Sequence, residues 1–233
     1  KVEHLSTALS PTDRKNTLAR IKARLDDKQD TDWTLIATSL VEAGVDFSFR
    51  SGVRESSSLP SLLQLGGRVN RHNEYDEARV WSVSLRPGGG IRQHQAMKIP
   101  ATVLTRLFKQ DRVKPHACTA ALNQEVKEAG NPILVKNLFQ WDAAKRFPHV
   151  AEAFKVIASD TVTVLTPGPF LEALKTGVRP DWKALQSHSV QIWATKKIDF
   201  GLVPLDAYPG LFAWSLAYDD FIGYMAGAID VLA

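Results

Sequence analysis

The segment ATSLVEAGVD, residues 37–46, contains residue types that could contact a nucleotide or a phosphate. The apolar run 34–38 predicts a β-strand long enough for a sheet buried on both faces, so Thr38 would present its hydroxyl at the carboxyl edge of that sheet. Ligands bind at this edge in open α/β sheets. Gly44 allows a close turn of the chain. Asp46 offers a carboxylate that can accept a hydrogen bond from a ribose hydroxyl.

The segment QLGGRVNR, residues 64–71, places two arginines three positions apart. On helical or near-helical backbone, Arg68 and Arg71 would project to one side. Two planar, permanently charged guanidinium groups suit a triphosphate, and arginines that reach a nucleotide held elsewhere stabilise the charge of phosphoryl transfer. Taken singly, a threonine at a strand end is usually structural and an arginine pair is usually solvated. The nucleotide hypothesis therefore depends on both segments occurring together.

Residues 1–86 alternate strand and helix patterns, which favours a parallel α/β sheet. Ser10, with Pro11 and Asp13, predicts a capped helix that runs to about Asp27, with a capping box at its start. Ser58–Ser61 opens a second short helix. The remaining strands are expected at 34–38, 47–53 and 79–85.

The run Arg86–Gly90 should end this first domain, because its prolines and glycines interrupt regular structure. A linker, residues 87–138, follows, with a helix from Pro100 whose apolar stripe is Val103, Leu104, Leu107 and Phe108. Residues 139–233 predict a small α+β domain. Its expected strands are 162–166 and 189–193, and its expected helices are 141–146, a segment after Pro148, 170–175 and 181–187.

Composition and charge narrow the class of protein. The 233 residues are 44% apolar, but no apolar run approaches the roughly 20 residues of a membrane-spanning helix. The single cysteine, Cys118, excludes an internal disulfide and a cysteine-based zinc cluster, and it fits a reducing cytoplasm. The first residue is not methionine, which we interpret as a sign that the chain is a piece of a longer protein.

The net charge of +4 is small, but basic residues concentrate between Arg92 and Lys114. Lys98, Arg106 and Lys109 belong to this cluster, which would suit a phosphate backbone; a solvated helix face is the equally weighted alternative. In contrast, residues 201–224 are aromatic and net acidic, which favours packing on the domain or docking of a partner protein. Trp141, Trp182, Trp193 and Trp214 could stack on bases, although tryptophans at such positions are more often core.

The two segments match motifs V and VI of superfamily 2 helicases, T-x-x-x-x-x-G-x-D and Q-x-x-G-R-x-x-R. The upstream stretch HLSTALSPTDR, residues 4–14, resembles the motif IV region. The sequence of residues 37–71, including Asn70, resembles the CRISPR-associated type I helicase–nuclease family. Residues 154–167 and 191–193 resemble that family's C-terminal domain less specifically. The resemblance covers 1–86 well and 139–233 moderately.

The resemblance implies a second RecA-like domain over residues 1–86, with a parallel sheet flanked by helices, then a linker helix and a C-terminal accessory domain that closes over DNA. Nucleotide contacts would come from Gln64, Arg68 and Arg71 at the ATP phosphates, with Arg68 or Arg71 as arginine finger, and from Gly44 and Asp46 in the cleft. Thr38 and Thr7 would contact single-stranded DNA. ATP and Mg²⁺ would be held mainly by a first RecA-like domain. The implied partners are single-stranded DNA, the CRISPR surveillance complex with its R-loop, and the nuclease and first RecA-like domains of the intact protein.

Several motifs of a complete helicase–nuclease are missing from this sequence. It contains no G-x-x-x-x-G-K-[ST] phosphate loop and no adjacent His–Asp pair. Residues 76–79 imitate a D-E-A-x box but precede a strand, so we interpret them as a surface turn. His116 and Cys118 have no second ligand pair nearby, which favours a structural role. We therefore expect the chain alone to be inactive toward ATP.

Two other functions fit the same residues. The chain could be a non-catalytic, stand-alone module that binds nucleic acid or a protein, or it could belong to a superfamily 2 translocase outside CRISPR defence. The length of the encoded reading frame separates the first alternative from the motor, and binding to an R-loop complex separates the second.

Overall fold

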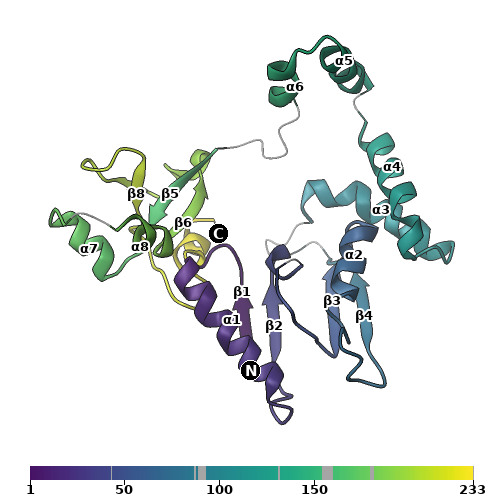
Figure 1. Ribbon diagram of the computed structural model, residues 1–233, viewed down its shortest axis with the longest axis horizontal. Coiled ribbons are helices and arrows are strands. Elements are labelled where there is room, and N and C mark those ends of the chain that lie inside the picture. The colour runs from purple at the N-terminus through teal and green to yellow at the C-terminus, as the bar shows by residue number, and fades with distance from the viewer. Residues whose placement is uncertain are drawn as a thin grey trace. The chain divides into compact units, whose positions relative to one another are not determined.

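The computed structural model describes residues 1–42, 44–86, 88, 93–130, 132–153, 160–178 and 181–232, without the side chains of residues 132–135 and 230–232. The chain divides into two compact units (Figure 1). Unit 1 comprises residues 1–45 and 157–233, and unit 2 comprises residues 46–156. Residues 1–45 thus group with the C-terminal residues, whereas the sequence predicted domain boundaries after residues 86 and 138. Arg92, residues 154–159, Ala43, Pro87, Gly89 and Gly90, on which parts of the sequence predictions fall, lie outside the described residues.

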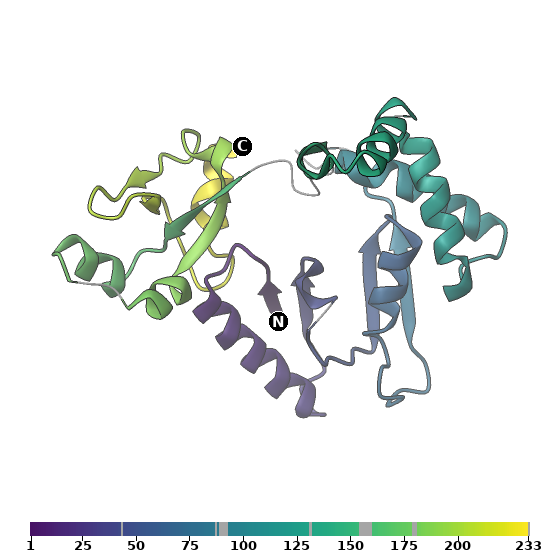
Figure 2. The same cartoon turned by 45° about the horizontal axis from the view of Figure 1, so that its top comes forward.

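Unit 1 begins with a small parallel sheet and one long helix. Strand β1 (Val2–Leu5) pairs with β2 (Thr34–Ala37) in parallel, with Leu5 opposite Ala37. Helix α1 (Pro11–Asp26) connects them and packs on β1 (Figures 1 and 2). Ile36 is 59% exposed, so the prediction of a strand buried on both faces is wrong. The reason is that two strands with one helix packed against them are too narrow to enclose both faces.

The N-terminus of α1 confirms the predicted cap but changes the capping box. Ser10 is buried, and its Oγ accepts a hydrogen bond from the Asp13 N–H at 3.2 Å. In a capping box the Asp13 carboxylate would reach back to the backbone N–H of Ser10. Instead, Ser10 Oγ donates to Asp13 Oδ2 at 2.7 Å, and the Ser10 N–H donates to the hydroxyl of Tyr218 at 2.9 Å. A residue 208 positions away therefore satisfies this buried donor.

The segment 218–224, which we call the C-terminal clasp, contacts the loop between β1 and α1. The Tyr218 hydroxyl also donates to Asp13 Oδ2, and Tyr224 N–H donates to Ala8 O at 3.2 Å. His4 Nδ1 lies 2.7 Å from the carbonyl oxygen of Phe221. At Gly223, which has φ +67°, an added Cβ would lie 2.1 Å from Ala8 O. The acidic, aromatic segment therefore packs within unit 1, against residues that the sequence analysis assigned to the other domain.

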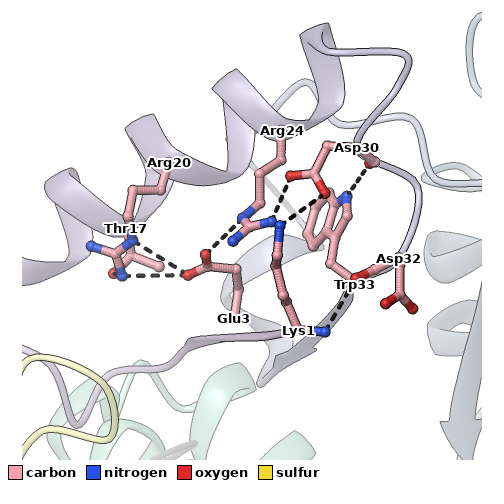
Figure 3. A network of polar contacts seen from close by, with 8 residues as sticks. All are labelled: Lys1, Glu3, Thr17, Arg20, Arg24, Asp30, Asp32 and Trp33. Atoms are coloured by element: carbon pink, nitrogen blue, oxygen red, sulfur yellow. Dashed lines mark hydrogen bonds and ion pairs between the residues drawn. The ribbon is translucent and has the colours of Figure 1, made fainter.

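A charged network joins β1 to α1 and to the loop before β2 (Figure 3). Glu3 is only 5% exposed, and its carboxylate accepts from Arg24 Nε at 2.9 Å and from Arg20 at 3.4 Å. Arg24 also pairs with Asp30 at 2.6 Å, and its guanidinium lies 5.7 Å from the centroid of the Trp33 ring. The two arginines compensate the negative charge of the buried carboxylate, whose burial without a partner would cost roughly several kcal/mol of desolvation free energy.

The C-terminal part of unit 1 is an α+β arrangement, as predicted. Its four-stranded sheet has the order β6-β5-β8-β7 and is mixed, since β5 pairs antiparallel with β6 and parallel with β8. The strands are β5 (Thr161–Leu165), β6 (Ser189–Trp193), β7 (Val203–Pro204) and β8 (Leu211–Ala213). The helices are α7 (Pro169–Lys175), α8 (Trp182–Ser187), η3 (Ala194–Lys196) and α9 (Met225–Leu232), while η1 (Ser39–Val41) follows β2. Trp214 is buried in the core with Val164 and Ile192, whereas Trp182 and Trp193 are exposed.

Unit 2 contains a second parallel pair of strands and a helical part. Strands β3 (Ser51–Glu55) and β4 (Arg79–Val83) pair in parallel, and α2 (Leu59–Gly66) lies between them in sequence. The short helix predicted from Ser58–Ser61 is α2, and Ser58 caps it by accepting from the Ser61 N–H. The other helices are α3 (Gln95–Lys109), η2 (Pro115–Ala117), α4 (Cys118–Ala129), α5 (Pro132–Ala143) and α6 (Phe147–Ala153). The predicted α/β class is confirmed, but the described strands of residues 1–86 form two small sheets rather than one.

The core of unit 2 is built by α2, α3 and α4. Its buried residues include Leu59 and Leu62 of α2 and Val103, Leu104 and Leu107 of α3. Helix α3 starts at Gln95, capped by His94, so Pro100 lies inside the helix and does not begin it. Phe108, the fourth residue of the predicted stripe, is 50% exposed, because the other three positions already fill the face toward α4 and α2.

Candidate functional site

Two threonines stand at the carboxyl edge of the sheet in unit 1. Thr7 and Thr38 are both exposed; Thr38 follows β2 directly, and Thr7 lies two residues after the end of β1. The strands are parallel, and the Thr38 N–H donates to Leu5 O at 3.2 Å, which extends the pairing to the point where the strands end. The sequence argument that placed Thr38 at this edge is therefore consistent with the structure. Two exposed hydroxyls at one edge can donate hydrogen bonds to a phosphate backbone.

The turn after η1 uses the predicted glycine. Gly44 has φ +77°, in the left-handed region where a side chain is strained, and an added Cβ would meet no atom within 4 Å. The requirement for glycine is therefore conformational and not spatial. Asp46 follows two residues later and is exposed.

Asp46 and Arg71, predicted from separate segments, form an ion pair in unit 2. Arg71 Nε lies 3.0 Å from Asp46 Oδ1, and the two side chains are 42% and 70% exposed. His72 Nε2 lies 3.5 Å from the same oxygen. The sequence analysis did not single out His72, and only its position beside Arg71 could have indicated it. An exposed pair of this kind contributes about 0–1 kcal/mol, so either partner can be withdrawn at small cost.

The two arginines do not share a helix, which corrects the argument from three-residue spacing. Helix α2 ends at Gly66, and Val69 makes a parallel bridge with Phe49. Phe49 N–H donates to Arg68 O, and Asn70 N–H donates to Phe49 O, both at 2.8 Å. The chain between the arginines is thus extended and then turned. Gln64, by contrast, is exposed on the last turn of α2.

Asn70 shapes the turn that presents Arg71. It has φ +49°, a conformation that asparagine adopts more readily than most residues. Its side chain brackets the backbone of Tyr75, because Nδ2 donates to Tyr75 O at 2.8 Å and Oδ1 accepts from Tyr75 N–H at 3.0 Å. The sequence analysis used Asn70 only as a mark of resemblance, and the structure gives it a physical reason.

The basic residues of the predicted linker differ in their contacts: one forms an ion pair and two are exposed. Arg106 forms an ion pair with Glu128 of α4, so it faces the neighbouring helix. Lys98 and Lys109 are exposed on α3. Their spacing of eleven residues is about three turns, which puts both on the face that also carries Thr102 and Thr105. On the same α4, burial raises the pKa of the Glu125 carboxyl.

Other site types find no support in the part of the chain that the structure describes. No group of three or more His, Cys, Asp or Glu side chains could hold a metal ion there. None of its helices combines the length and apolar character needed to cross a membrane. Residues 76–79, which imitate an acidic ATPase box, are exposed and lie at the start of β4, as the surface-turn interpretation predicted.

The sequence of residues 1–74 matches the family described as "CRISPR-associated nuclease/helicase Cas3, C-terminal". These residues include both motif segments. A curated relative, the CRISPR-associated nuclease/helicase Cas3 of Haloferax volcanii, is 39% identical over 56 residues, which make up 22% of this chain and 6% of the relative.

Solved structures extend the likeness in fold to most of the chain. The crystal structure of T. fusca Cas3 gives a TM-score of 0.61 at 11% identity, covering 96% of this chain and 35% of that one. The structure of T. fusca Cas3 with ATP gives 0.60 at 12% identity, covering 91% and 32%. A chain of a CRISPR RNA-guided surveillance complex, pre-nicking, gives 0.55 at 11% identity, covering 96% and 37%.

The chain is thus a mixed α/β protein, and both of its motif segments, residues 37–46 and 64–71, lie in the part that matches this family model. Residues 1–74 match the model of the Cas3 nuclease/helicase C-terminal family, and 96% of the chain is similar in fold to part of the solved structure of T. fusca Cas3. The chain spans about a third of the length of those structures.

Proposed function

We propose that this chain is the second RecA-like domain, with the C-terminal accessory domain, of an ATP-dependent single-stranded DNA translocase that acts in CRISPR interference. The observation that carries the proposal is the contact between Asp46 and Arg71, at 3.0 Å. This contact joins one residue of each motif segment, and both segments lie in the part of the chain that matches the family model. Residues that bind one nucleotide are expected to lie close together even when the nucleotide is absent.

The ion pair fits a resting state of an arginine finger. Asp46 holds the Arg71 guanidinium near the surface, where 42% of the side chain is exposed. Releasing an exposed pair costs at most about 1 kcal/mol, and a triphosphate is a more highly charged acceptor than one carboxylate. Arg71 can therefore turn from Asp46 to a phosphate, while Asp46 becomes free to accept from a ribose hydroxyl. Arg68 and Gln64 would assist from the same segment.

Nucleotide and metal would be bound mainly outside this chain. Its sequence has no phosphate-cradling loop, so ATP and Mg²⁺ are assigned to a first RecA-like domain of the intact protein. When bound there, ATP supplies the phosphoryl group whose transfer the arginines stabilise. The chain alone should not hydrolyse ATP.

DNA contacts are assigned to two places. Thr7 and Thr38 would donate hydrogen bonds to phosphates at the carboxyl edge of β1 and β2. Lys98 and Lys109 add two exposed positive charges on α3, whereas Arg106 is engaged with Glu128 and would contribute less. One chain of a solved CRISPR RNA-guided surveillance complex is similar in fold, which supports a complex of that kind as the partner. That the complex holds an R-loop is part of the proposal.

Substitution of Arg71 in the intact enzyme tests the proposal. Arg71→Ala should lower kcat for DNA-stimulated ATP hydrolysis by roughly 10³-fold, because the charge of phosphoryl transfer loses its stabilising cation. Nucleotide binding should change little, and Arg71→Lys should not restore the rate, since lysine lacks the planar fork. Arg146→Ala, at an exposed position of unit 2 outside the basic cluster, is the matched control. An Arg71→Ala enzyme with unchanged ATPase activity refutes the assignment.

A further inference from the structure

One face of the β3–β4 pair in unit 2 bears exposed side chains, Val53 and Trp81, in the part of the chain that the structure describes. At Gly52 an added Cβ would lie 3.0 Å from Leu65 Cδ1 and 3.0 Å from Val69 Cγ2, so this side of the sheet faces α2. Side chains alternate along a strand, so Ser51 and Val53 point to the opposite face. Their partners on β4, Arg79 and Trp81, share that face.

The exposed aromatic residue on this face lacks a partner. Trp81 is 43% exposed and Val53, directly opposite, is 64% exposed. Among the residues that the structure describes, the Trp81 indole makes no ring contact, no cation–π contact and no hydrogen bond. An exposed apolar patch such as the one that Trp81 and Val53 form can mark a binding surface.

Two arginines flank this tryptophan around a shallow hollow. The hollow has a volume of about 290 Å³ and is lined by Arg50, Ser51, Glu77, Arg79 and Trp81. Arg79 pairs with Glu77 at 3.3 Å, but both side chains are more than 65% exposed. Arg50 has no ion-pair partner within the described part of the chain. The hollow therefore combines a flat apolar surface with at least one uncompensated guanidinium.

The charge of the whole unit favours the same ligand. Unit 2 contains 17 basic and 10 acidic residues, a net charge of +7, whereas unit 1 contains 12 basic and 15 acidic residues, a net charge of −3. Positive potential over a surface attracts polyanions. A volume near 290 Å³ lies at the low end of small-molecule sites, which suits one base with its phosphate.

We infer that this hollow is a contact for single-stranded nucleic acid, with one base stacked on Trp81 and the adjoining phosphates on Arg50 and Arg79. The site is separate from the threonines and from the α3 lysines of the proposed function, and it deepens that function by adding a stacking contact for the strand. Arginine contacts to phosphates together with aromatic stacking are the chemistry by which proteins bind unpaired strands without reading sequence.

Binding of a fluorescein-labelled 15-nucleotide dT strand to the full chain, measured by anisotropy at several salt concentrations, tests the site. Trp81→Ala should weaken binding about 10-fold with an unchanged salt slope, and Trp81→Phe should restore most of the affinity. Arg50→Ala with Arg79→Ala should lower the slope of log K against log salt by about 1.4, since each lost phosphate contact on a single strand removes about 0.7. Phe139→Ala and Lys22→Ala, at exposed positions elsewhere, are the controls.

Three outcomes would overturn the inference. Variants at Trp81 and at the two arginines could bind the strand like the wild type, Trp81→Phe could lose as much affinity as Trp81→Ala, or free dTMP could displace the strand at a similar concentration, which would assign the hollow to mononucleotides. Should Trp81→Ala fail to fold, Trp81→Phe and the arginine variants decide the question. A chain that does not bind the strand at all refutes this site, while the ATPase test of Arg71 still decides the motor assignment.

Discussion

Removal of one hydroxyl, in Tyr218→Phe, should destabilise unit 1 because that hydroxyl joins the C-terminal clasp to the start of α1. It accepts the N–H of Ser10 at 2.9 Å and donates to Asp13 Oδ2. Ser10 is only 1% exposed, so its N–H would remain buried without an acceptor in the variant. Phenylalanine preserves the ring, so that packing changes little.

The magnitude follows from the two bonds. A hydrogen bond between neutral groups contributes about 0.5–1.5 kcal/mol, and one to a carboxylate about 1.5–3 kcal/mol. Asp13 keeps its bond from Ser10 Oγ at 2.7 Å, and Tyr218 is only partly buried, which together reduce the loss. We expect a decrease of about 2–3 kcal/mol in the free energy of unfolding.

The same bond predicts a pH dependence at the alkaline end. Burial, reinforced by the hydrogen bond to Asp13, raises the pKa of Tyr218 from 10.0 to about 12. The stabilisation is therefore complete below pH 10, where the phenol is neutral in both states, and it is lost as the pH rises through 12. The difference in stability between wild type and Tyr218→Phe should stay constant up to pH 10 and shrink from pH 10 to 12.

Urea denaturation followed by circular dichroism measures both effects. Tyr208→Phe is the matched control, because its hydroxyl makes a single 3.4 Å bond to Val178 O at the surface and should change stability by less than about 0.5 kcal/mol. A Tyr218→Phe protein as stable as the control, or a difference that does not change above pH 10, would refute the role of this hydroxyl.

Two further substitutions probe the same unit. Glu3→Gln should lower the free energy of unfolding by about 2 kcal/mol, since the charged hydrogen bonds from Arg24 and Arg20 weaken while Arg24 keeps its pair with Asp30. A cost below about 1 kcal/mol in urea denaturation would mean that the network of Figure 3 contributes little. Gly223→Ala should unfold the clasp, because the new Cβ would lie 2.1 Å from Ala8 O, whereas Gly210→Ala, at φ +88° with open space around it, should cost only about 1–2 kcal/mol. Equal melting temperatures for the two glycine variants would contradict this reasoning.

Local signals in the sequence predicted local structure well. Ser10 was predicted as a helix cap and Ser58–Ser61 as a helix start, because such signals depend on residues within three positions, and the structure confirms both. The alternating pattern of residues 79–85 predicted β4, and residues 189–193 were predicted as the strand that is β6. Both predictions depend on neighbouring residues alone. Pro100 was misplaced as a helix start, because His94, the residue that caps α3, lacks a strong capping preference and gave no signal.

Long-range contacts could not be predicted from one sequence. Nothing around Ser10 indicates that Tyr218 supplies its acceptor, and the helical argument for Arg68 and Arg71 failed because Val69 pairs with Phe49 instead of continuing α2. The ion pair between Asp46 and Arg71 was not predicted, because the resemblance of the two motifs only assigned both residues to one nucleotide site. Their assigned roles stay predictions until the ATPase of the intact enzyme is measured.

The discontinuity of unit 1 has a consequence for synthesis on the ribosome. Unit 2 is one continuous stretch, so all of its residues are available once residue 156 has left the exit tunnel. Residues 1–45, in contrast, can contact the C-terminal clasp only after Tyr224 has been synthesised. Pairing across more than 200 residues is slow, because the closure of so long a loop costs entropy before any contact forms. The start of the chain is therefore completed last, and the nascent β1 and α1 must remain soluble until then.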